Sequence, residues 1–358
     1  MLVDSSTSGL PTLPADVQPA VLQEINLAEL RNGSASEQQK LSQAALNDGF
    51  FYLDLRHPTT QLLLEQVDPT LQLSKLIFDH SAEVKNLFDV DKISSLKTNG
   101  YKPKGRNIVN KDDARDGFES WALPRNGILK IGADPFPRLP VVEEAQDTLH
   151  ILLESLEDVA QTIFRSLSDL LGLAPEHRLE AFHEPHKPST SILRLLKYHA
   201  RAQGASHPPL VPHTDLGSLT FLFSATPGLQ VLSTVAGAAP SGKEEWAYIA
   251  PKPGYAVVNL GDCASMMTNG ALKSAVHRVG PLPGAGMPER YSLAYLIRPN
   301  DDAVLRPLGS PLVSSQGGGM EPITCADWIT KKYKVLRGDD RIRRDDDQVM
   351  TGGRKVFV

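Results

Sequence analysis

The sequence contains very little cysteine. Only two cysteines, Cys263 and Cys325, occur among its 358 residues. Two thiols are too few for a disulfide framework, and their separation is not the spacing that cysteine ligands of a metal site show. The composition therefore excludes the small disulfide-rich secreted class. It favours a reducing compartment, so we expect a cytoplasmic location.

An excess of positive charge and long apolar runs are also missing. The formal net charge is −5 and the basic residues are scattered, which leaves no electrostatic footprint for nucleic acid. No run approaches 18 apolar residues, and the first residues lack a basic segment followed by an apolar one. We therefore expect neither membrane insertion nor secretion. The pattern carries no information on oligomeric state.

The most informative stretch is VPHTDLGSLTFLF, residues 211–223, an apolar segment typical of a β-strand. Alternate side chains of a strand project to the same face, so His213 and Asp215 would offer two ligands to one metal ion. The best candidate for a third ligand is His277 in KSAVHRVG. Two imidazoles and one carboxylate on one side of a metal, with the other side open, are the facial triad of non-haem Fe(II) oxygenases.

A His-x-Asp pair alone is a weak signal, because it also arises by chance and a strand histidine often serves only a structural hydrogen bond. The segments downstream strengthen it. Short β-type runs punctuated by Gly and Pro follow at 228–232, 245–262, 268–279 and 290–299. This order favours antiparallel strands that return His277 to the first pair, and hence a mainly β core.

Helices are expected ahead of this core. Apolar residues recur at three- and four-residue intervals through 141–171, and Gly172 follows as a stop. This pattern predicts a long packing helix that covers the outside of the β core. Before it, the segment that ends at Gly49 is expected to be helical, with further helices at roughly 60–80 and 82–88.

A series of short segments runs in a fixed order from about residue 20 to residue 337. The segments are GFFYL, LRLLKY, PHTDLGSLTFL, GLQVL, a Trp followed by P-x-PG and VVNLGD, TNG-x-LKSAVHRV, and R-Y-S. This series resembles the isopenicillin N synthase-like branch of the Fe(II)/2-oxoglutarate-dependent dioxygenases. The resemblance implies an α+β chain built on a double-stranded β-helix, or jelly roll, flanked by helices. It also implies an oxidoreductase that uses Fe(II), 2-oxoglutarate as co-substrate and O2.

The resemblance assigns a co-substrate site as well. Arg290 and Ser292 share a strand face and offer a guanidinium fork and a hydroxyl to a carboxylate, which the resemblance identifies as the distal carboxylate of 2-oxoglutarate. The alternative for Arg290 is an ordinary ion pair at the surface. Tyr198 matches a tyrosine that the family often places near the co-substrate or substrate carboxylate, and a buried structural tyrosine is its alternative.

Candidates for the substrate wall come from two sources. The family resemblance makes part of the segment 97–126 a substrate-side wall, with a surface loop as the alternative. Neighbourhood and strand parity supply the other candidates. The candidates are Tyr101, Leu210, Leu222, Val279, Ala294 and Leu296. His199 and His207 precede the metal motif, but neither lies in an alternating apolar run, so neither is expected to be a ligand.

Three functions stay open at this point. The first is a 2-oxoglutarate-dependent oxygenase that hydroxylates, desaturates, epoxidises or cyclises a small substrate of specialised metabolism. The second is an Fe(II) oxidase of the isopenicillin N synthase kind, which uses no 2-oxoglutarate and also carries R-x-S. The third is a non-catalytic jelly-roll binding protein, which would have no need to keep all three ligands.

No Pro/Gly/Ser-rich linker divides the chain, so one catalytic domain is the simplest organisation. Charged clusters fill the tail after 338, and such a segment is too polar to build core, so we expect it at the surface or mobile. The expected division is a flexible lead-in at 1–18, a helical and mixed portion at 19–190, the Fe(II)/2-oxoglutarate jelly-roll core at 191–300, a helical cover at 301–337 and the charged tail at 338–358.

Overall fold

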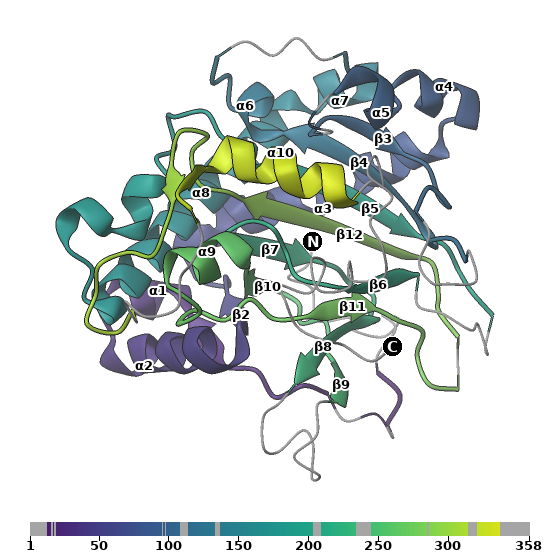
Figure 1. The fold of residues 1–358 in the computed structure, drawn as a ribbon. Coiled ribbons are helices and arrows are strands. Elements are labelled where there is room, and N and C mark those ends of the chain that lie inside the picture. The colour runs from purple at the N-terminus through teal and green to yellow at the C-terminus, as the bar shows by residue number, and fades with distance from the viewer. Residues whose placement is uncertain are drawn as a thin grey trace.

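The described residues form two main β-sheets, with helices on the outer side of the larger one, and a third sheet of two strands (Figure 1). The lead-in up to residue 12 and the tail from residue 337 lie outside the described residues, so the expected division into segments stays a prediction. The computed structural model describes residues 13–15, 17, 19–94, 96, 98–107, 114–132, 137–202, 209–233, 245–284, 286–313 and 321–336.

The elements follow the chain in a mixed order that becomes mainly β after residue 190. The strands are β1 (Glu24–Asn26), β2 (Phe50–Asp54), β3 (Gly100–Lys102), β4 (Phe118–Pro124), β5 (Ile192–Tyr198), β6 (Leu210–His213), β7 (Leu219–Phe223), β8 (Leu229–Ser233), β9 (Glu245–Tyr248), β10 (Tyr255–Leu260), β11 (His277–Val279), β12 (Arg290–Ile297), β13 (Val304–Leu305) and β14 (Ile323–Thr324). The helices are α1 (Leu27–Arg31), α2 (Ala35–Gln43), α3 (Gln61–Asp79), α4 (Ala82–Leu87), α5 (Val90–Ile93), α6 (Arg125–Ile128), α7 (Pro140–Glu144), α8 (Gln146–Leu171), α9 (Asp262–Met267) and α10 (Cys325–Leu336). Short π- or 3₁₀-helical turns lie at Ala44–Asp48, Pro58–Thr60, Pro175–His177 and Leu179–Phe182.

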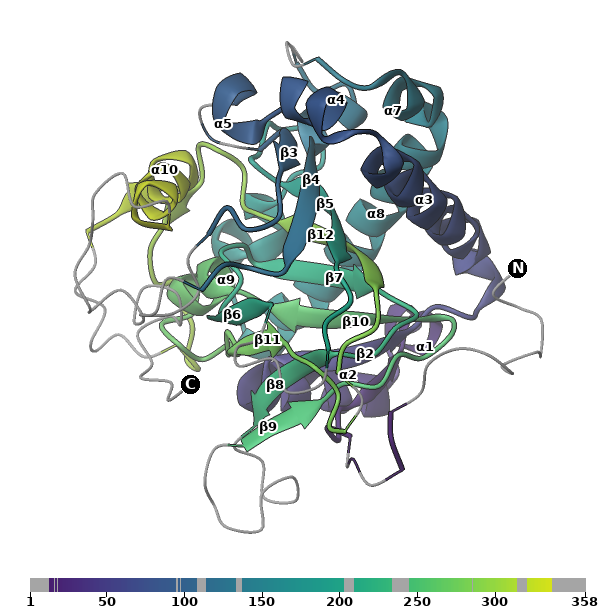
Figure 2. The same ribbon diagram turned by 90° about the vertical axis from the view of Figure 1, so that its right-hand side faces the viewer.

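The two sheets face each other. The larger sheet has eight strands in the order β1-β2-β10-β7-β12-β5-β4-β3, and the smaller has four in the order β6-β11-β8-β9. Figure 2 shows the smaller sheet against one face of the larger sheet, with α3 and α8 against the other face. Apart from the parallel β1–β2 pair, the strand pairs of the larger sheet are antiparallel. This is the expected jelly roll.

Strand β12 illustrates why the larger sheet can be covered on both faces. Its residues Leu293, Tyr295 and Ile297 pack in the cluster shared with the helices, whereas Ala294 and Leu296 pack in the cluster between the two sheets. Alternate side chains of a strand point to opposite faces, so a strand covered on both sides is apolar at nearly every position. The two clusters are therefore separated by the larger sheet itself.

The helical layer follows the predicted periodicity with one difference. The apolar stripe of α8 is buried from Leu149 to Leu171, and Gly172 ends the helix in the left-handed conformation with φ 62°. The predicted single helix is broken at Ala145, which has ψ 7° and separates α7 from α8. Gly49 ends the turn before β2 with φ 70°, and a Cβ there would lie 2.4 Å from the carbonyl oxygen of Lys273, so only glycine fits.

A buried histidine connects this helical layer to the loop after β6. The side chain of His183 is 3% exposed and stacks on Phe164 with 4.0 Å between ring centroids. Its Nδ1 lies 2.7 Å from the carbonyl oxygen of Leu179, and its Nε2 lies 2.8 Å from Oγ of Ser218. Burial lowers the pKa of His183 from 6.5 to about 4, because the apolar surroundings disfavour the imidazolium form.

This depressed pKa predicts acid sensitivity in a defined window. Between pH 6.5 and about 4 the unfolded chain binds a proton at His183 that the folded chain does not, so stability falls as the pH falls through that window. The loss attributable to this residue is about 3 kcal/mol, since each unit of pKa shift corresponds to about 1.4 kcal/mol. In His183→Gln the free energy of unfolding, measured with urea on metal-free protein, should decline less steeply between pH 7 and 4.5. The exposed His80→Gln is the matched control, and identical slopes in wild type and His183→Gln would contradict the prediction.

Candidate active site

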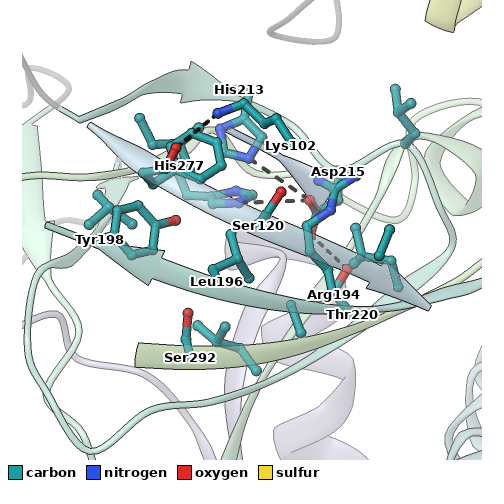
Figure 3. A pocket seen from close by; sticks show the side chains of 18 of the residues that line it. Lys102, Ser120, Arg194, Leu196, Tyr198, His213, Asp215, Thr220, His277 and Ser292 are labelled. Atoms are coloured by element: carbon teal, nitrogen blue, oxygen red, sulfur yellow. Dashed lines mark hydrogen bonds and ion pairs between the residues drawn. The ribbon is translucent and has the colours of Figure 1, made fainter. Parts of the chain in front are cut away.

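Three side chains with metal-binding atoms converge between the two sheets. Strands β6 and β11 pair antiparallel with His277 directly opposite His213, and the imidazole centroids are 4.3 Å apart. The Oδ1 atom of Asp215 lies 4.0 Å from Nε2 of His213 and 3.9 Å from Nε2 of His277. The ligand atoms of the three residues all lie within 4.8 Å of one another. Figure 3 shows this convergence at one wall of the pocket.

Asp215 reaches this position differently from the sequence expectation. Strand β6 ends at His213, so Asp215 lies in the turn that follows and not on the same extended strand. The physical reason is a set of backbone bonds that hold the turn against the start of α9. The amide of Asp262 donates to the carbonyl oxygen of Asp215 (2.8 Å), and the amide of Cys263 donates to that of Gly217 (3.0 Å). A Cβ on Gly261 would lie 2.7 Å from the carbonyl oxygen of Asp215, so a glycine is needed for this approach.

The two imidazoles are oriented so that their Nε2 atoms can bind a metal ion. Nδ1 of His213 lies 3.0 Å from the carbonyl oxygen of Val211, and Nδ1 of His277 lies 3.2 Å from that of Ala275. A carbonyl oxygen can only accept, so Nδ1 carries the proton and the Nε2 lone pair faces Asp215. Burial, reinforced by His277, lowers the pKa of His213 to about 4. The donor set therefore fits a divalent metal ion.

The carboxylate of Asp215 is fixed by two donors from the larger sheet. Its Oδ2 accepts hydrogen bonds from Oγ1 of Thr220 (2.7 Å) and Nδ2 of Asn259 (2.8 Å), while Oδ1 faces the histidines. Burial acts to raise the pKa of Asp215, but the two histidines and the two hydrogen bonds outweigh it and lower that pKa overall. The side chain is thus an ionised ligand held in one orientation.

A second polar group lies farther along the same face of the larger sheet. Arg290 is opposite Tyr198 in the β12–β5 pair, and its guanidinium carbon is 5.3 Å from the centre of the tyrosine ring. Arg290 is 2% exposed; its Nε donates to the carbonyl oxygen of Thr226 (3.1 Å) and its Nη1 to Oγ of Ser292 (3.0 Å). No carboxylate pairs with Arg290 among the described residues. Burial lowers the pKa of Arg290 and raises the pKa of Tyr198 to about 12.

The metal-binding residues and Arg290 line one cavity of about 340 Å³. Its size is in the range of small-molecule sites. Five of the six residues predicted for the substrate wall line it, namely Leu210, Leu222, Val279, Ala294 and Leu296. His199 lies outside it and contacts Glu119 at 3.1 Å, whereas His207 lies outside the described residues.

Tyr101 is the exception, and its expected role is corrected. Gly100 and Lys102 line the cavity, so the residue between them in β3 points to the opposite face. There Tyr101 is 5% exposed, packs near Trp121 with 6.1 Å between ring centroids, and donates a hydrogen bond to Glu119 (2.8 Å). It belongs to the core between the larger sheet and the helices.

Sequence reasoning missed several polar residues of the cavity. They are Lys102, Arg194, Thr220 and Asn259. Strand parity was a usable signal for Arg194, since Tyr198 and Arg194 are four positions apart in β5 and therefore share a face. Asn259 belongs to the VVNLGD segment that marks the family, but nothing in that segment predicts a contact with Asp215.

Comparison with known proteins agrees with this geometry. The model of the 2OG-Fe(II) oxygenase superfamily matches residues 189–299. The chain is 33% identical over 340 residues, 94% of its own length and 97% of the relative, to the 2-oxoglutarate-dependent dioxygenase frbH of Dothideomycetidae sp. (strain 11243). It is 30% identical to the 2-oxoglutarate-dependent dioxygenase gloE of Glarea lozoyensis, over 92% of each chain. The chain belongs to the 2OG-Fe(II) oxygenase superfamily.

Solved structures of low identity show the same fold. Full-length Neurospora crassa T7H in complex with alpha-KG superposes with a TM-score of 0.70 at 22% identity, covering 90% of this chain and 99% of that one. JOX2 in complex with 2OG, Fe and JA gives a TM-score of 0.67 at 24% identity, covering 94% and 92%. Membership of the superfamily, with the three metal-binding side chains in place, makes this chain an oxidoreductase that uses Fe(II), 2-oxoglutarate and O2. Among the described residues, none of its helices is long and apolar enough to cross a membrane.

The hydrogen bonds to Asp215 give a prediction for the metal affinity of the oxygenase. Replacing Asn259 by Ala removes one of the two donors that orient the carboxylate. Outer partners of this kind typically change metal affinity by about 10- to 100-fold, so Fe(II) or Mn(II) binding, measured by calorimetry without oxygen, should weaken within that range. Asn86→Ala, at an exposed position of α4, is the matched control. Unchanged affinity in Asn259→Ala would mean that Thr220 alone orients the ligand.

Proposed function

We propose that His213, Asp215 and His277 hold the Fe(II) of this oxygenase, and that Arg290, Ser292 and Tyr198 hold the distal carboxylate of 2-oxoglutarate. The reaction would be the oxidation of a C–H bond of a small specialised metabolite by hydroxylation, desaturation, epoxidation or ring formation. The observation that carries the proposal is the convergence of three metal-binding atoms in one cavity with a buried arginine that has no carboxylate partner among the described residues. The names of frbH and gloE as 2-oxoglutarate-dependent dioxygenases support it.

When bound, Fe(II) and 2-oxoglutarate supply the activation of O2 toward the C–H bond. The protein contributes position and surroundings. The Nδ1 hydrogen bonds of the two histidines keep both Nε2 atoms turned to the cavity, and the bonds from Thr220 and Asn259 keep Asp215 ionised and fixed. Apolar side chains such as Leu222, Val279 and Leu296 line the same cavity and reduce access of water to the reacting centre.

The burial of Arg290 favours a co-substrate that carries its own carboxylate. A charge taken out of water without a partner is costly, and the free energy is recovered only when an opposite charge with matching geometry binds. The Nε and Nη1 groups of Arg290 are held by Thr226 and Ser292, which fixes the plane of the guanidinium. A planar carboxylate such as that of 2-oxoglutarate matches this fixed fork.

The compartment is a separate part of the proposal. Cys263 and Cys325 are both buried and free. Thiols in this state, together with their low number in the sequence, support a reducing setting and a cytoplasmic location.

The metal ligands can be tested directly. His277→Ala should lower Fe(II) occupancy and turnover by well over tenfold and leave the fold largely intact, because the β core depends mainly on apolar burial. Iron content after reconstitution, circular dichroism and the succinate formed per O2 consumed are the measurements. His199→Ala, which removes a histidine that lies outside the cavity, is the control. Full iron stoichiometry in His277→Ala would rule out this ligand set, and O2 consumption without succinate would favour an oxidase.

The co-substrate site predicts unequal effects of three substitutions. Arg290→Lys keeps the charge but loses the planar two-donor fork. Since a hydrogen bond to a charged group contributes roughly 1.5 to 3 kcal/mol, the Kd for 2-oxoglutarate should rise by about one to two powers of ten. Ser292→Ala should have a smaller effect, and Tyr198→Phe a smaller one still. Titration of 2-oxoglutarate into the anaerobic Fe(II) protein, followed by the metal-to-ligand absorption band, measures this. Equal Kd values for wild type and Arg290→Lys would remove 2-oxoglutarate from this pocket.

A further inference from the structure

The cavity carries more positive than negative side chains. The charge of bound Fe(II) and the charges of the two carboxylates of 2-oxoglutarate cancel, so binding of both leaves the surplus of positive charge unchanged. Among the described residues that line the cavity, the basic ones are Lys102, Arg106, Arg194, Arg290 and Arg298, and the acidic ones are Asp91 and Asp215.

Three of these cations have acceptors within the protein. Lys102 contacts Asp116 at 2.7 Å. Arg106 forms ion pairs with two aspartates of the segment around α5, Asp89 and Asp91. Arg298 donates to the carbonyl oxygen of Thr190 and to the hydroxyl of Tyr333 in α10. Arg290 is the cation that the proposed function assigns to 2-oxoglutarate.

The part of the chain that the structure describes offers no such acceptor to Arg194. Its Nε atom is buried without a hydrogen-bond partner, and no ion pair joins the guanidinium to a carboxylate of the described residues. The nearby carboxylates are already used. Both Oδ atoms of Asp116 accept bonds, from the amide of Gly105 (2.7 Å) and the amide of Asn107 (3.1 Å), besides the contact with Lys102. Oδ2 of Asp215 is occupied by Thr220 and Asn259.

The position of Arg194 separates it from the co-substrate site. It lies four residues from Tyr198 on the same face of β5, which is about 13 Å along a strand. Tyr198 is opposite Arg290, whereas Arg194 is opposite Ala294 and Ala122. Figure 3 shows Arg194 beside Asp215 and Thr220 at one end of the pocket, and Tyr198 and Ser292 at the other end. Leu196 lies between the two ends.

The charge of Arg194 acts on its neighbours. The pKa of Lys102 is lowered to about 8, mainly by burial, and Arg194 adds to this although Asp116 opposes it. Two like charges thus share one end of the cavity, and an anion bound there would relieve their repulsion.

We propose that Arg194 binds a carboxylate of the substrate, so that this oxygenase takes small, mainly apolar carboxylic acids. This inference rests on the proposed function, which leaves the substrate class open. A planar guanidinium binds a carboxylate through two parallel hydrogen bonds. The apolar wall that includes Ala122, Leu222 and Leu296 would contact the rest of the molecule. One unpaired cation in such surroundings suits a single negative charge better than a dianion, because desolvating the second charge would be costly.

The test compares acids with neutral analogues of the same shape. Wild-type protein loaded with Fe(II) and saturated with 2-oxoglutarate, without oxygen, is titrated calorimetrically with hexanoate, octanoate and phenylacetate and with their primary amides. At least one acid should bind about 10- to 100-fold more tightly than its amide, the range expected for hydrogen bonds to a charged group. In Arg194→Gln this preference should disappear while amide binding is unchanged, and Arg194→Lys should retain part of it.

Two controls separate a binding role from a structural one. Arg31→Gln removes the same charge from a surface ion pair with Asp158 and should keep the wild-type preference for acids. In Arg194→Gln the Kd for 2-oxoglutarate should stay within about twofold of wild type, since the co-substrate is held at the other end of the cavity. The melting temperature should stay within a few degrees of wild type.

The outcomes that overturn the inference are distinct. If no acid binds more tightly than its amide, or if the preference survives in Arg194→Gln, Arg194 does not select a carboxylate. If the Kd for 2-oxoglutarate rises as much as the Kd for the acid, Arg194 serves the co-substrate instead. If wild-type protein fails to bind Fe(II) and 2-oxoglutarate, the proposed function fails and the substrate assignment fails with it. Intact loading with equal acid and amide binding overturns the substrate assignment alone.

Discussion

The carboxylate of Asp215 connects the two sheets at the metal-binding site. The histidines that face it belong to strands β6 and β11 of the smaller sheet, whereas its hydrogen-bond donors Thr220 and Asn259 belong to β7 and β10 of the larger sheet. The geometry of the three ligand atoms therefore depends on the relative position of the sheets. The apolar cluster between the sheets sets that position, and the cavity is the part of the interface that side chains do not fill.

Charged side chains on the two faces of the larger sheet differ in whether they have a partner of opposite charge. On the helix-covered side, buried charges are paired within the protein, as in Arg125 with Glu157 (2.7 Å) and Lys85 with Glu119 (2.8 Å). On the cavity side, Arg194 and Arg290 have no carboxylate partner among the described residues. An unpaired charge as fully buried as that of Arg290 destabilises the fold by several kcal/mol, and the half-buried Arg194 bears part of that cost, so such residues are expected where a ligand supplies the opposite charge. The contrast between the faces is the physical basis for assigning both arginines to ligands.

The parts predicted correctly share a simple geometry. Strand β12 is continuous over eight residues, so parity placed Ala294 and Leu296 on the cavity side without error, and the 3.6-residue period placed α8. The errors arose where geometry changes within a few residues. Asp215 lies beyond the end of its strand, because backbone bonds from α9 hold the turn. Tyr101 was expected in the substrate wall. Strand β3 is short and lies in a polar segment, so the sequence pattern did not show which of its side chains face the cavity.

The sequence by itself determined the metal-binding residue types, their order and the antiparallel core, because these follow from side-chain chemistry and local periodicity. It also carried the ordered segments that mark the superfamily. Only the tertiary structure decided which charges stay unpaired, because Arg194, Lys102 and Asp116 come from separate strands and loops whose contacts no local pattern encodes. For the same reason the role of Asn259 appeared only when β10 was placed beside β7. Long-range pairing brings these groups together, and pairing depends on the packing of the whole chain.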